Sequence, residues 1–403
     1  MNTGNLDRDR DSSRPGECGA YGSDLPPVEG GAERSFLSVL PAAAAKPVST
    51  LPQHGARRAG KLTTEAYAQG IRQGDRGVLA RAITLVESSS REHQLQAQSL
   101  LQQLLPDTGK ARRVGITGVP GVGKSTFIEA FGCWLCSRGM KVAVLAVDPS
   151  STRTGGSILG DKTRMEQLCR QPLAFIRPSP AGSALGGVAR KTRETLLLCE
   201  AAGFDVVLVE TVGVGQSEVA VRSMVDFFLL LILPGAGDEL QGIKRGIMEQ
   251  ADAVVVTKAD GTNRVRAEQA RQEYATALHY LEPPTPGWST PAFLSSAITG
   301  EGIEEFWNTL DQYYEKLGAS GHIAARRRRQ TLDWLHQMVR EELESRFYGI
   351  PGVASARAEA ETALMRGEIT APQAARMLLT AADEPMAGSE GRLHPRPSTH
   401  SAR

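Results

Sequence analysis

Short apolar runs alternate with helix-like stretches through the middle of the chain. The apolar runs lie at 113–117, 141–147, 173–176, 205–210, 227–233, 253–257 and 291–294. Near-continuous apolar strands, each followed by a crossover, are typical of a mostly parallel sheet that is covered by helices on both faces. Residues 111–317 are therefore predicted to form an α/β domain. Its ligands are expected beyond the carboxyl ends of the strands.

Helical periodicity precedes this domain. Between Leu62 and Leu105 apolar residues recur at helical spacing, and Gly74-Asp75 indicates a turn between two helices. We assign residues 61–110 to an N-terminal helical segment. Residues 1–60 are rich in Gly, Pro, Ser, Asp and Arg without periodicity, which predicts a disordered extension.

A second helical region follows the domain. Its apolar residues form one helical stripe, made up of Leu332, Leu335, Met338, Val339, Leu343 and Phe347. Pro351-Gly352 interrupts the stripe, and a second helical segment continues to about residue 382. We assign residues 318–383 to a C-terminal helical dimerisation arm, because its small core is expected to pack on the domain, on a second subunit or on both. Residues 384–403 are interpreted as a disordered tail.

The basic run at 326–329 belongs to the start of this arm. We interpret it as the solvated start of a helix, with nucleic-acid contact as the minor alternative. The net charge of the 403 residues is +1, so no long-range field favours nucleic acid or an anionic membrane as a partner.

Composition also bears on location. The longest apolar run, 227–233, is too short to span a bilayer, and the N-terminus lacks the pattern of a secretory signal or a transit peptide. The five cysteines are an odd number, which fits a reducing compartment. Cys133 and Cys136 form C-x-x-C without a second pair, so neither a metal nor a redox role is expected. We expect a soluble cytoplasmic protein.

The stretch after the first predicted strand matches the phosphate-binding pattern G-x-x-x-x-G-K-[ST] and leads into a predicted helix. Its glycines let the backbone wrap a polyphosphate closely, with N–H groups directed inward. Lys124 is expected on the β- and γ-phosphates, and Ser125 is expected to offer its hydroxyl to Mg²⁺. The predicted nucleotide contacts in this stretch are Gly118, Val119, Pro120, Gly121, Val122, Gly123, Lys124, Ser125 and Thr126.

Two later loops favour guanine as the base. Thr257-Lys258-Ala259-Asp260 resembles the guanine-reading motif [NT]-K-x-D, with Thr257 in the place of the usual Asn. Asp260 would accept two hydrogen bonds that adenine cannot donate, and Lys258 would stack its stem along the base. Ser296-Ala297, followed by Ile298, match the second guanine loop, whose backbone N–H groups meet the base oxygen. Together these loops favour GTP over ATP, although the first motif is short and an ordinary surface loop is its alternative.

Three carboxylates complete the predicted site. Glu210 ends a strand where related proteins carry the Asp of D-x-x-G, Asp148 ends another strand, and Asp161 lies in a loop. Hard cations take oxygen ligands, so we assign Mg²⁺ to Ser125, Asp148, Asp161 and Glu210. The catalytic assignment is Lys124, Asp161 and Glu210. For either aspartate, a helix N-cap or a loop charge is the alternative.

Hydrolysis is expected to be slow without a partner. Val214 follows Gly213, so no glutamine stands directly after that glycine to orient an attacking water. We therefore expect a partner to accelerate the reaction.

Five motifs in this order resemble the acyl-CoA (methylmalonyl-CoA) mutase-associated G proteins, the MeaB/ArgK type of P-loop GTPase. They lie at 118–126, 147–151, 160–165, 210–217 and 237–244, and the resemblance runs from about residue 65 to 380. It implies a GTPase that works as a homodimer and chaperones an adenosylcobalamin-dependent acyl-CoA mutase by gating cofactor loading and preventing inactivation. It also implies that Asp148, Asp161 and Glu210 are the Mg²⁺-site carboxylates.

The segment 238–244 resembles the family's mobile loop that relays the nucleotide state to the mutase; an ordinary loop is the alternative. Methylmalonyl-CoA mutase is the default partner, and related mutases for isobutyryl or 2-hydroxyisobutyryl thioesters stay open.

Three other functions fit these residues less well. A nickel-type metallochaperone GTPase would need a His/Cys cluster, and the seven histidines are scattered. An ATP-dependent kinase linked to amino-acid transport would need ATP preference, which Asp260 argues against. A purely structural module is disfavoured by the intact Lys124-Ser125 pair.

Overall fold

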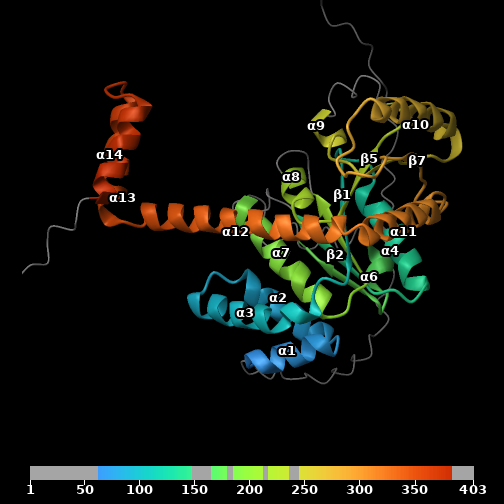
Figure 1. Ribbon diagram of the computed structural model, residues 1–403, viewed down its shortest axis with the longest axis horizontal. Coiled ribbons are helices and arrows are strands. Elements are labelled where there is room, and N and C mark those ends of the chain that lie inside the picture. Colours follow the sequence, from blue (N-terminus) through green and yellow to red (C-terminus); the bar gives the residue numbers. More distant parts are fainter. Residues whose placement is uncertain (1–61, 148–164, 179–184, 212–216, 236–244, 384–403) are drawn as a thin grey trace, which may run out of the picture. The chain divides into compact units, whose positions relative to one another are not determined.

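The computed structural model describes residues 62–147, 165–178, 185–211, 217–235 and 245–383. The strands in these ranges are β1 (Arg112–Gly118), β2 (Val142–Val147), β3 (Ala174–Arg177), β4 (Val206–Thr211), β5 (Phe227–Ile232), β6 (Ala253–Val256) and β7 (Ala292–Leu294). They form a seven-stranded sheet in the order β3-β2-β4-β1-β5-β6-β7, and each neighbouring pair is parallel (Figure 1). Each predicted apolar run overlaps one of these strands, so the predicted parallel sheet is confirmed.

The helices lie before, between and after the strands. The earlier ones are α1 (Thr64–Arg72), α2 (Arg76–Glu87), α3 (Arg91–Leu104), α4 (Lys124–Ser137), α6 (Glu166–Cys169), α7 (Leu185–Ala201) and α8 (Ser217–Arg222). The later ones are α9 (Arg245–Met248), α10 (Arg264–His279), α11 (Ile303–Ala319), α12 (His322–Tyr348), α13 (Pro351–Met365) and α14 (Ala371–Asp383). Short 3-10 turns occur at Leu105–Asp107 and Gly261–Asn263.

Alternate residues of the strands build cores on the two faces of the sheet. In β5, Phe227 packs against Phe306 of α11, and that ring also contacts Phe127 of α4. The next residue, Phe228, belongs to a separate cluster that includes residues of α2 and α7. Because successive side chains of a strand point to opposite faces, helices cover both faces, as predicted.

The N-terminal helices α1, α2 and α3 contact one another and α7. Asp75 caps α2 by accepting hydrogen bonds from the backbone N–H groups of Gly77 and Val78 at 2.8 and 3.0 Å. Gly74, just before it, has a φ of 74°, a conformation in which glycine meets little steric cost. The predicted turn between two helices is therefore confirmed.

The start of α12 is anchored to the amino edge of the sheet. Arg327 donates from Nε and Nη2 to the two carboxylate oxygens of Asp226, at 2.8 and 2.6 Å. Arg326 donates to Tyr313 Oη at 2.6 Å, and both arginine side chains are only 18% exposed. The interpretation of this basic run as a solvated helix start was wrong for Arg326 and Arg327, because buried carboxylates receive them. It holds for Arg328 and Arg329, which are exposed.

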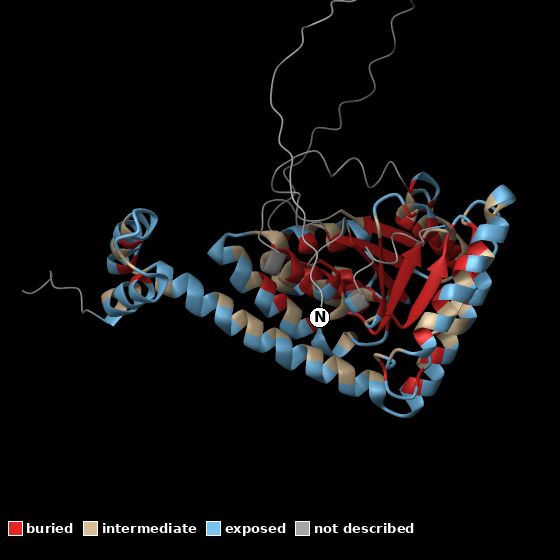
Figure 2. Cartoon of the chain, turned by 90° about the horizontal axis from the view of Figure 1, so that it is seen from above, coloured by how far each residue is buried: buried red, intermediate tan, exposed pale blue. Residues whose placement is uncertain are grey.

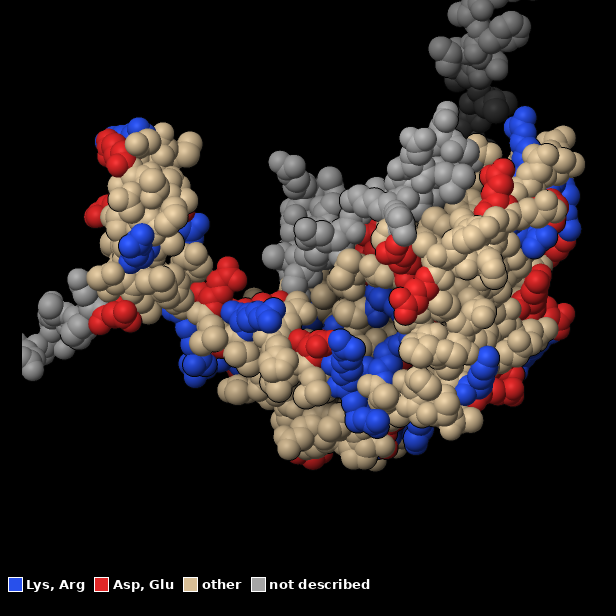
Figure 3. Space-filling view, turned by 45° about the horizontal axis from the view of Figure 1, so that its top comes forward, with Lys and Arg blue, Asp and Glu red and all other residues tan. Residues whose placement is uncertain are grey.

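The surface shows charges of both signs. Basic and acidic side chains both occur across the face drawn in Figure 3, in keeping with the net charge of +1. None of the helices in the described ranges combines the length and the apolar character needed to cross a membrane. The predicted disordered ends, 1–60 and 384–403, lie outside the described residues.

Candidate nucleotide site

The loop between β1 and α4 forms an open cradle. Gly121 and Gly123 have φ angles of 79° and 97°, in the left-handed region that favours glycine. A Cβ atom added to either glycine would meet no atom within 4 Å, so the space in front of both residues is clear. The loop ends at the N-terminus of α4, where unpaired backbone N–H groups and the helix dipole favour an anion. The arrangement suits a polyphosphate, as the sequence predicts.

Lys124 is the first residue of α4, and its side chain turns back over the loop. The residue is 9% exposed, and its ammonium donates to Gly118 O at 2.7 Å and to Val119 O at 3.3 Å. These contacts hold the ammonium beside the cradle formed by Gly121 and Gly123. A cation held there can neutralise phosphate charge without a large reorganisation of the protein.

Ser125 and Glu210 meet at the carboxyl edge of the sheet. Ser125 donates its hydroxyl to Glu210 Oε1 at 3.0 Å, and Glu210 is buried at the end of β4. A hydroxyl and a carboxylate are the oxygen donors that Mg²⁺ prefers, so the residues present fit this ion. Asp148 and Asp161, the other predicted ligands, lie outside the described residues, as do 212–216 and the loop at 238–244.

A hydroxyl pair behind this site was not anticipated from the sequence. Thr211 donates to Thr117 Oγ1 at 2.9 Å, and both residues are buried. The pair joins the C-terminal ends of β4 and β1. Glu210 lies at the end of β4, and the phosphate loop follows β1. Two threonines at the ends of two predicted strands were the signal available in the sequence.

The first predicted guanine loop packs against the phosphate loop. Thr257 donates its hydroxyl to Val122 O at 2.8 Å and to Ile232 O at 3.1 Å. Lys258 donates to Gly121 O at 3.0 Å and has a φ of 56°, which is uncommon for a residue with a side chain. Thr257 thus ties the two loops together in this chain, where the usual motif has Asn.

The second predicted guanine loop meets the first at Asp260. Ser296 donates its hydroxyl to Asp260 Oδ2, and Ser296 N donates to Glu301 O at 3.0 Å. A cavity of about 220 Å³ lies beside Asp260 and reaches Gly123 of the phosphate loop; Ala297 and Ile298 line it as well. The structure therefore brings Thr257, Lys258 and Asp260 of the first predicted guanine loop and Ala297 and Ile298 of the second to one cavity next to the phosphate cradle.

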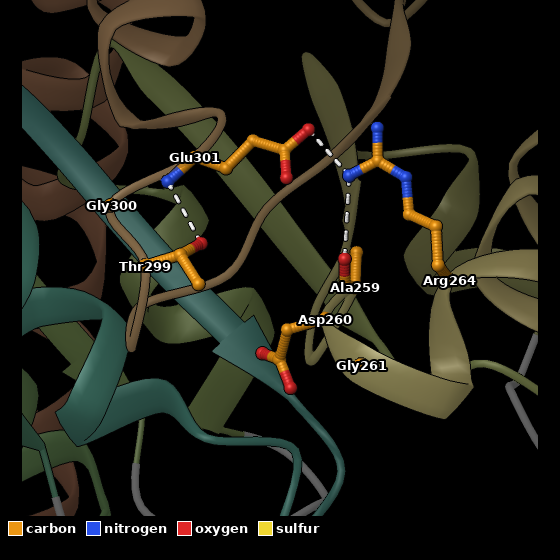
Figure 4. Close-up of a pocket in the computed structure, with 7 residues that line it drawn as sticks. All are labelled: Ala259, Asp260, Gly261, Arg264, Thr299, Gly300 and Glu301. Carbon is orange, nitrogen blue, oxygen red and sulfur yellow. Dashed lines mark hydrogen bonds and ion pairs between the residues drawn. The ribbon is translucent and has the colours of Figure 1, made fainter.

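Arg264 links the two loops through Ala259 and Glu301. Figure 4 shows the Arg264 guanidinium between Glu301, with which it pairs, and Ala259 O, to which it donates at 3.4 Å. This contact joins the two loops that carry Asp260 and Ser296. Arg264 and Glu301 were not singled out in the sequence, because they lie outside both short motifs.

Gly302 fixes the path of the second loop. Its φ is 78°, and an added Cβ would lie 2.0 Å from Leu294 O. Only glycine fits such a close approach between the end of β7 and the start of α11.

Comparisons with known proteins identify relatives of this chain. The sequence matches the family described as "Methylmalonyl Co-A mutase-associated GTPase MeaB" over residues 79–351. A "Putative GTPase" of Caulobacter vibrioides is 58% identical over 320 residues, which cover 79% of this chain and 98% of that protein. The "Methylmalonic aciduria type A homolog, mitochondrial" of Mus musculus is 46% identical over 322 residues, which cover 77% of this chain and 78% of that protein.

A comparison with solved structures also finds a similar protein. A crystal structure of an LAO/AO transport system kinase superposes with a TM-score of 0.65 at 38% sequence identity, covering 81% of this chain and 99% of that one. The similarity confirms the predicted fold class.

Proposed function

The chain belongs to the family of methylmalonyl Co-A mutase-associated GTPases, MeaB, and we propose that its GTP hydrolysis gates the loading of adenosylcobalamin into a partner acyl-CoA mutase and protects that mutase from inactivation. The chain is a GTPase, as its family and its relatives are named. Methylmalonyl-CoA mutase is the partner we favour, because the family description names it.

The observation that carries the hydrolytic part of the proposal is the contact between Ser125 and Glu210 beside the phosphate cradle. In the proposed arrangement, Lys124 binds the β- and γ-phosphates, and the backbone N–H groups of the loop surround them. Ser125 and Glu210 would hold Mg²⁺, together with Asp148 and Asp161. When bound, this ion would supply charge neutralisation at the phosphates.

Asp260 supports the choice of guanine. Its carboxylate lies beside the cavity that reaches the phosphate loop, and Ser296 holds it in place. In the proposed pose the carboxylate accepts the two N–H groups on one edge of guanine, which adenine does not offer.

The C-terminal arm supports a homodimer. Leu332, Leu335, Val339 and Leu343 of α12 are all between 47% and 60% exposed. Figure 2 shows how much of α12 is exposed along its length. An apolar stripe of this kind marks an interaction surface, and we assign a second copy of residues 318–383 as its occupant.

The test measures GTP hydrolysis by the purified chain, alone and with methylmalonyl-CoA mutase. We expect slow turnover alone and faster turnover with the mutase. Nucleotide should also change the transfer of adenosylcobalamin to the mutase. Lys124→Ala should bring hydrolysis to background, because it removes charge stabilisation of the phosphates. A mutase that changes neither hydrolysis nor cofactor transfer would contradict the proposed partnership while leaving the GTPase assignment intact.

A second measurement tests the base. Asp260→Ala removes two hydrogen bonds to a charged group, each worth roughly 1.5–3 kcal/mol, so GTP affinity should fall by about 100-fold or more. ATP affinity should change little. Glu304→Gln, at an exposed carboxylate of α11 outside both loops, is the matched control. Equal affinity of the native chain for GTP and ATP would favour the ATP-dependent kinase alternative.

A further inference from the structure

A second cavity lies at the other edge of the sheet. It has a volume of about 540 Å³ and is lined by Arg193 of α7, by Gln330 and Trp334 of α12 and by Arg113 of β1, among others. Figure 1 shows α12 crossing α7, and at this crossing Arg193 Nη1 donates to Gln330 O at 3.1 Å. Arg113 is near the start of β1, whose other end carries the phosphate loop. At about 3.3 Å per residue, the strand separates the two sites by roughly 16 Å.

Three polar atoms of residues that line this cavity are buried without a hydrogen-bond partner among the described residues. They are Arg193 Nε, Gln330 Oε1 and Trp334 Nε1. Buried polar atoms in folded proteins nearly always have a partner, so three of them around one cavity indicate a place for a bound group. Two of the atoms carry a hydrogen to donate and the third accepts one.

Arg193 places a positive charge at the cavity, and its guanidinium forms no ion pair with a carboxylate among the described residues. Arg193 is 7% exposed, and its other N–H groups bond to Gln330 O and, at 2.6 Å, to Ser223 Oγ, both neutral. Burial lowers the pKa of Arg193 to about 10, and the negative charge of Asp333 partly opposes this change. The guanidinium therefore stays charged at neutral pH.

The other buried cations of the cavity are already neutralised. Arg113 pairs with Glu200 and Arg327 pairs with Asp226. A ligand that matches this cavity therefore carries a negative charge for Arg193.

We propose that this cavity binds a small organic anion with an apolar chain. A carboxylate or a phosphate monoester accepts hydrogen bonds from Arg193 Nε and Trp334 Nε1. A donor on the ligand next to the anion meets Gln330 Oε1, whose orientation is fixed because Nε2 donates to Val225 O at 2.8 Å. The apolar chain lies against Leu196 and its neighbours. A mostly apolar wall with a few convergent polar groups is typical of small-molecule pockets of this size.

The experiment is calorimetric titration of the full chain with four probes: hexanoate, 2-hydroxyhexanoate, hexyl phosphate and 1-hexanol. We expect one saturable site for the anions and tighter binding of 2-hydroxyhexanoate than of hexanoate, because its hydroxyl can donate to Gln330 Oε1. Hexanol should bind at least about tenfold more weakly, since it lacks the charge that Arg193 requires. Comparison of the carboxylate probes with hexyl phosphate shows whether the site prefers a carboxylate or a phosphate monoester.

Two variants locate the site. Trp334→Phe replaces the indole with a smaller phenyl ring and removes an N–H group that has no hydrogen-bond partner among the described residues. Because Trp334 is only partly buried, the variant should fold and should bind the anions about fivefold more weakly or worse. Arg193→Met should weaken binding further. Trp134→Phe on α4, away from the cavity, is the control and should leave binding unchanged. Absence of saturable anion binding, equal binding of hexanol, or unchanged affinity in both cavity variants would overturn the proposal.

Discussion

Replacing Asp226 by Asn should destabilise the protein strongly, because Asp226 holds α12 against the sheet. The carboxylate is fully buried and accepts two hydrogen bonds from Arg327, one from Tyr314 Oη at 2.7 Å and one from Arg113 N at 3.2 Å. Burial alone would lower the pKa of Arg327, but the hydrogen bonds and charge of Asp226 outweigh it and raise that pKa above its ordinary value. Asp226→Asn thus leaves a buried cation without its counter-charge.

Removing one partner of a buried ion pair costs about 3–5 kcal/mol, a large part of the 5–15 kcal/mol that stabilises a typical domain. The assay is urea-induced unfolding followed by far-ultraviolet circular dichroism. The control is an exposed ion pair of α12: Glu342 pairs with Arg346, and their side chains are 60% and 75% exposed. Glu342→Gln should cost no more than about 0.5 kcal/mol, as expected for an exposed pair.

A double variant sharpens this test. Asp226→Asn combined with Arg327→Met removes the uncompensated charge, so it should be more stable than Asp226→Asn alone. A loss below about 1 kcal/mol for Asp226→Asn, or one equal to that of Glu342→Gln, would refute the anchoring role.

Three further changes probe other parts of the molecule. Gly302→Ala forces a Cβ to within 2.0 Å of Leu294 O, so it should destabilise the fold by about 1–3 kcal/mol or more in urea unfolding and weaken GTP binding. Burial raises the pKa of Glu194, so its ionised form opposes folding increasingly as the pH rises above about 4.3. Glu194→Gln should therefore gain stability over the native chain at pH 8 but not at pH 4, which thermal unfolding at both pH values checks. Ser125→Ala removes the hydroxyl beside Glu210 and should raise the Mg²⁺ concentration for half-maximal hydrolysis by at least about tenfold, measured in a metal titration.

The residues at the carboxyl edge of the sheet were predictable because they lie in short, continuous sequence motifs. The phosphate loop leaves β1 directly, and Thr257-Lys258-Ala259-Asp260 leaves β6 in the same way. In a parallel sheet these exits lie at one edge, so motifs far apart in sequence were expected to meet there. The structure brings Asp260 and Ser296 together as that reasoning requires. Whether nucleotide binds these residues as assigned stays a prediction.

The amino edge was misread because its contacts join single residues far apart in the chain. Asp226 and Asp252 each stand immediately before a strand, β5 and β6, and those strands are neighbours in the sheet. A carboxylate in front of each of two neighbouring buried strands requires a cation to accompany it into the interior. Arg327 supplies that charge to Asp226 from about 100 residues downstream. Asp252 pairs with Arg222 at 2.6 Å, and Arg326, about 70 residues downstream, lies 3.8 Å from it; no local pattern links residues so far apart. A basic run that follows such a sheet can therefore pair with buried carboxylates at the amino edge, and exposure to solvent is not its only explanation.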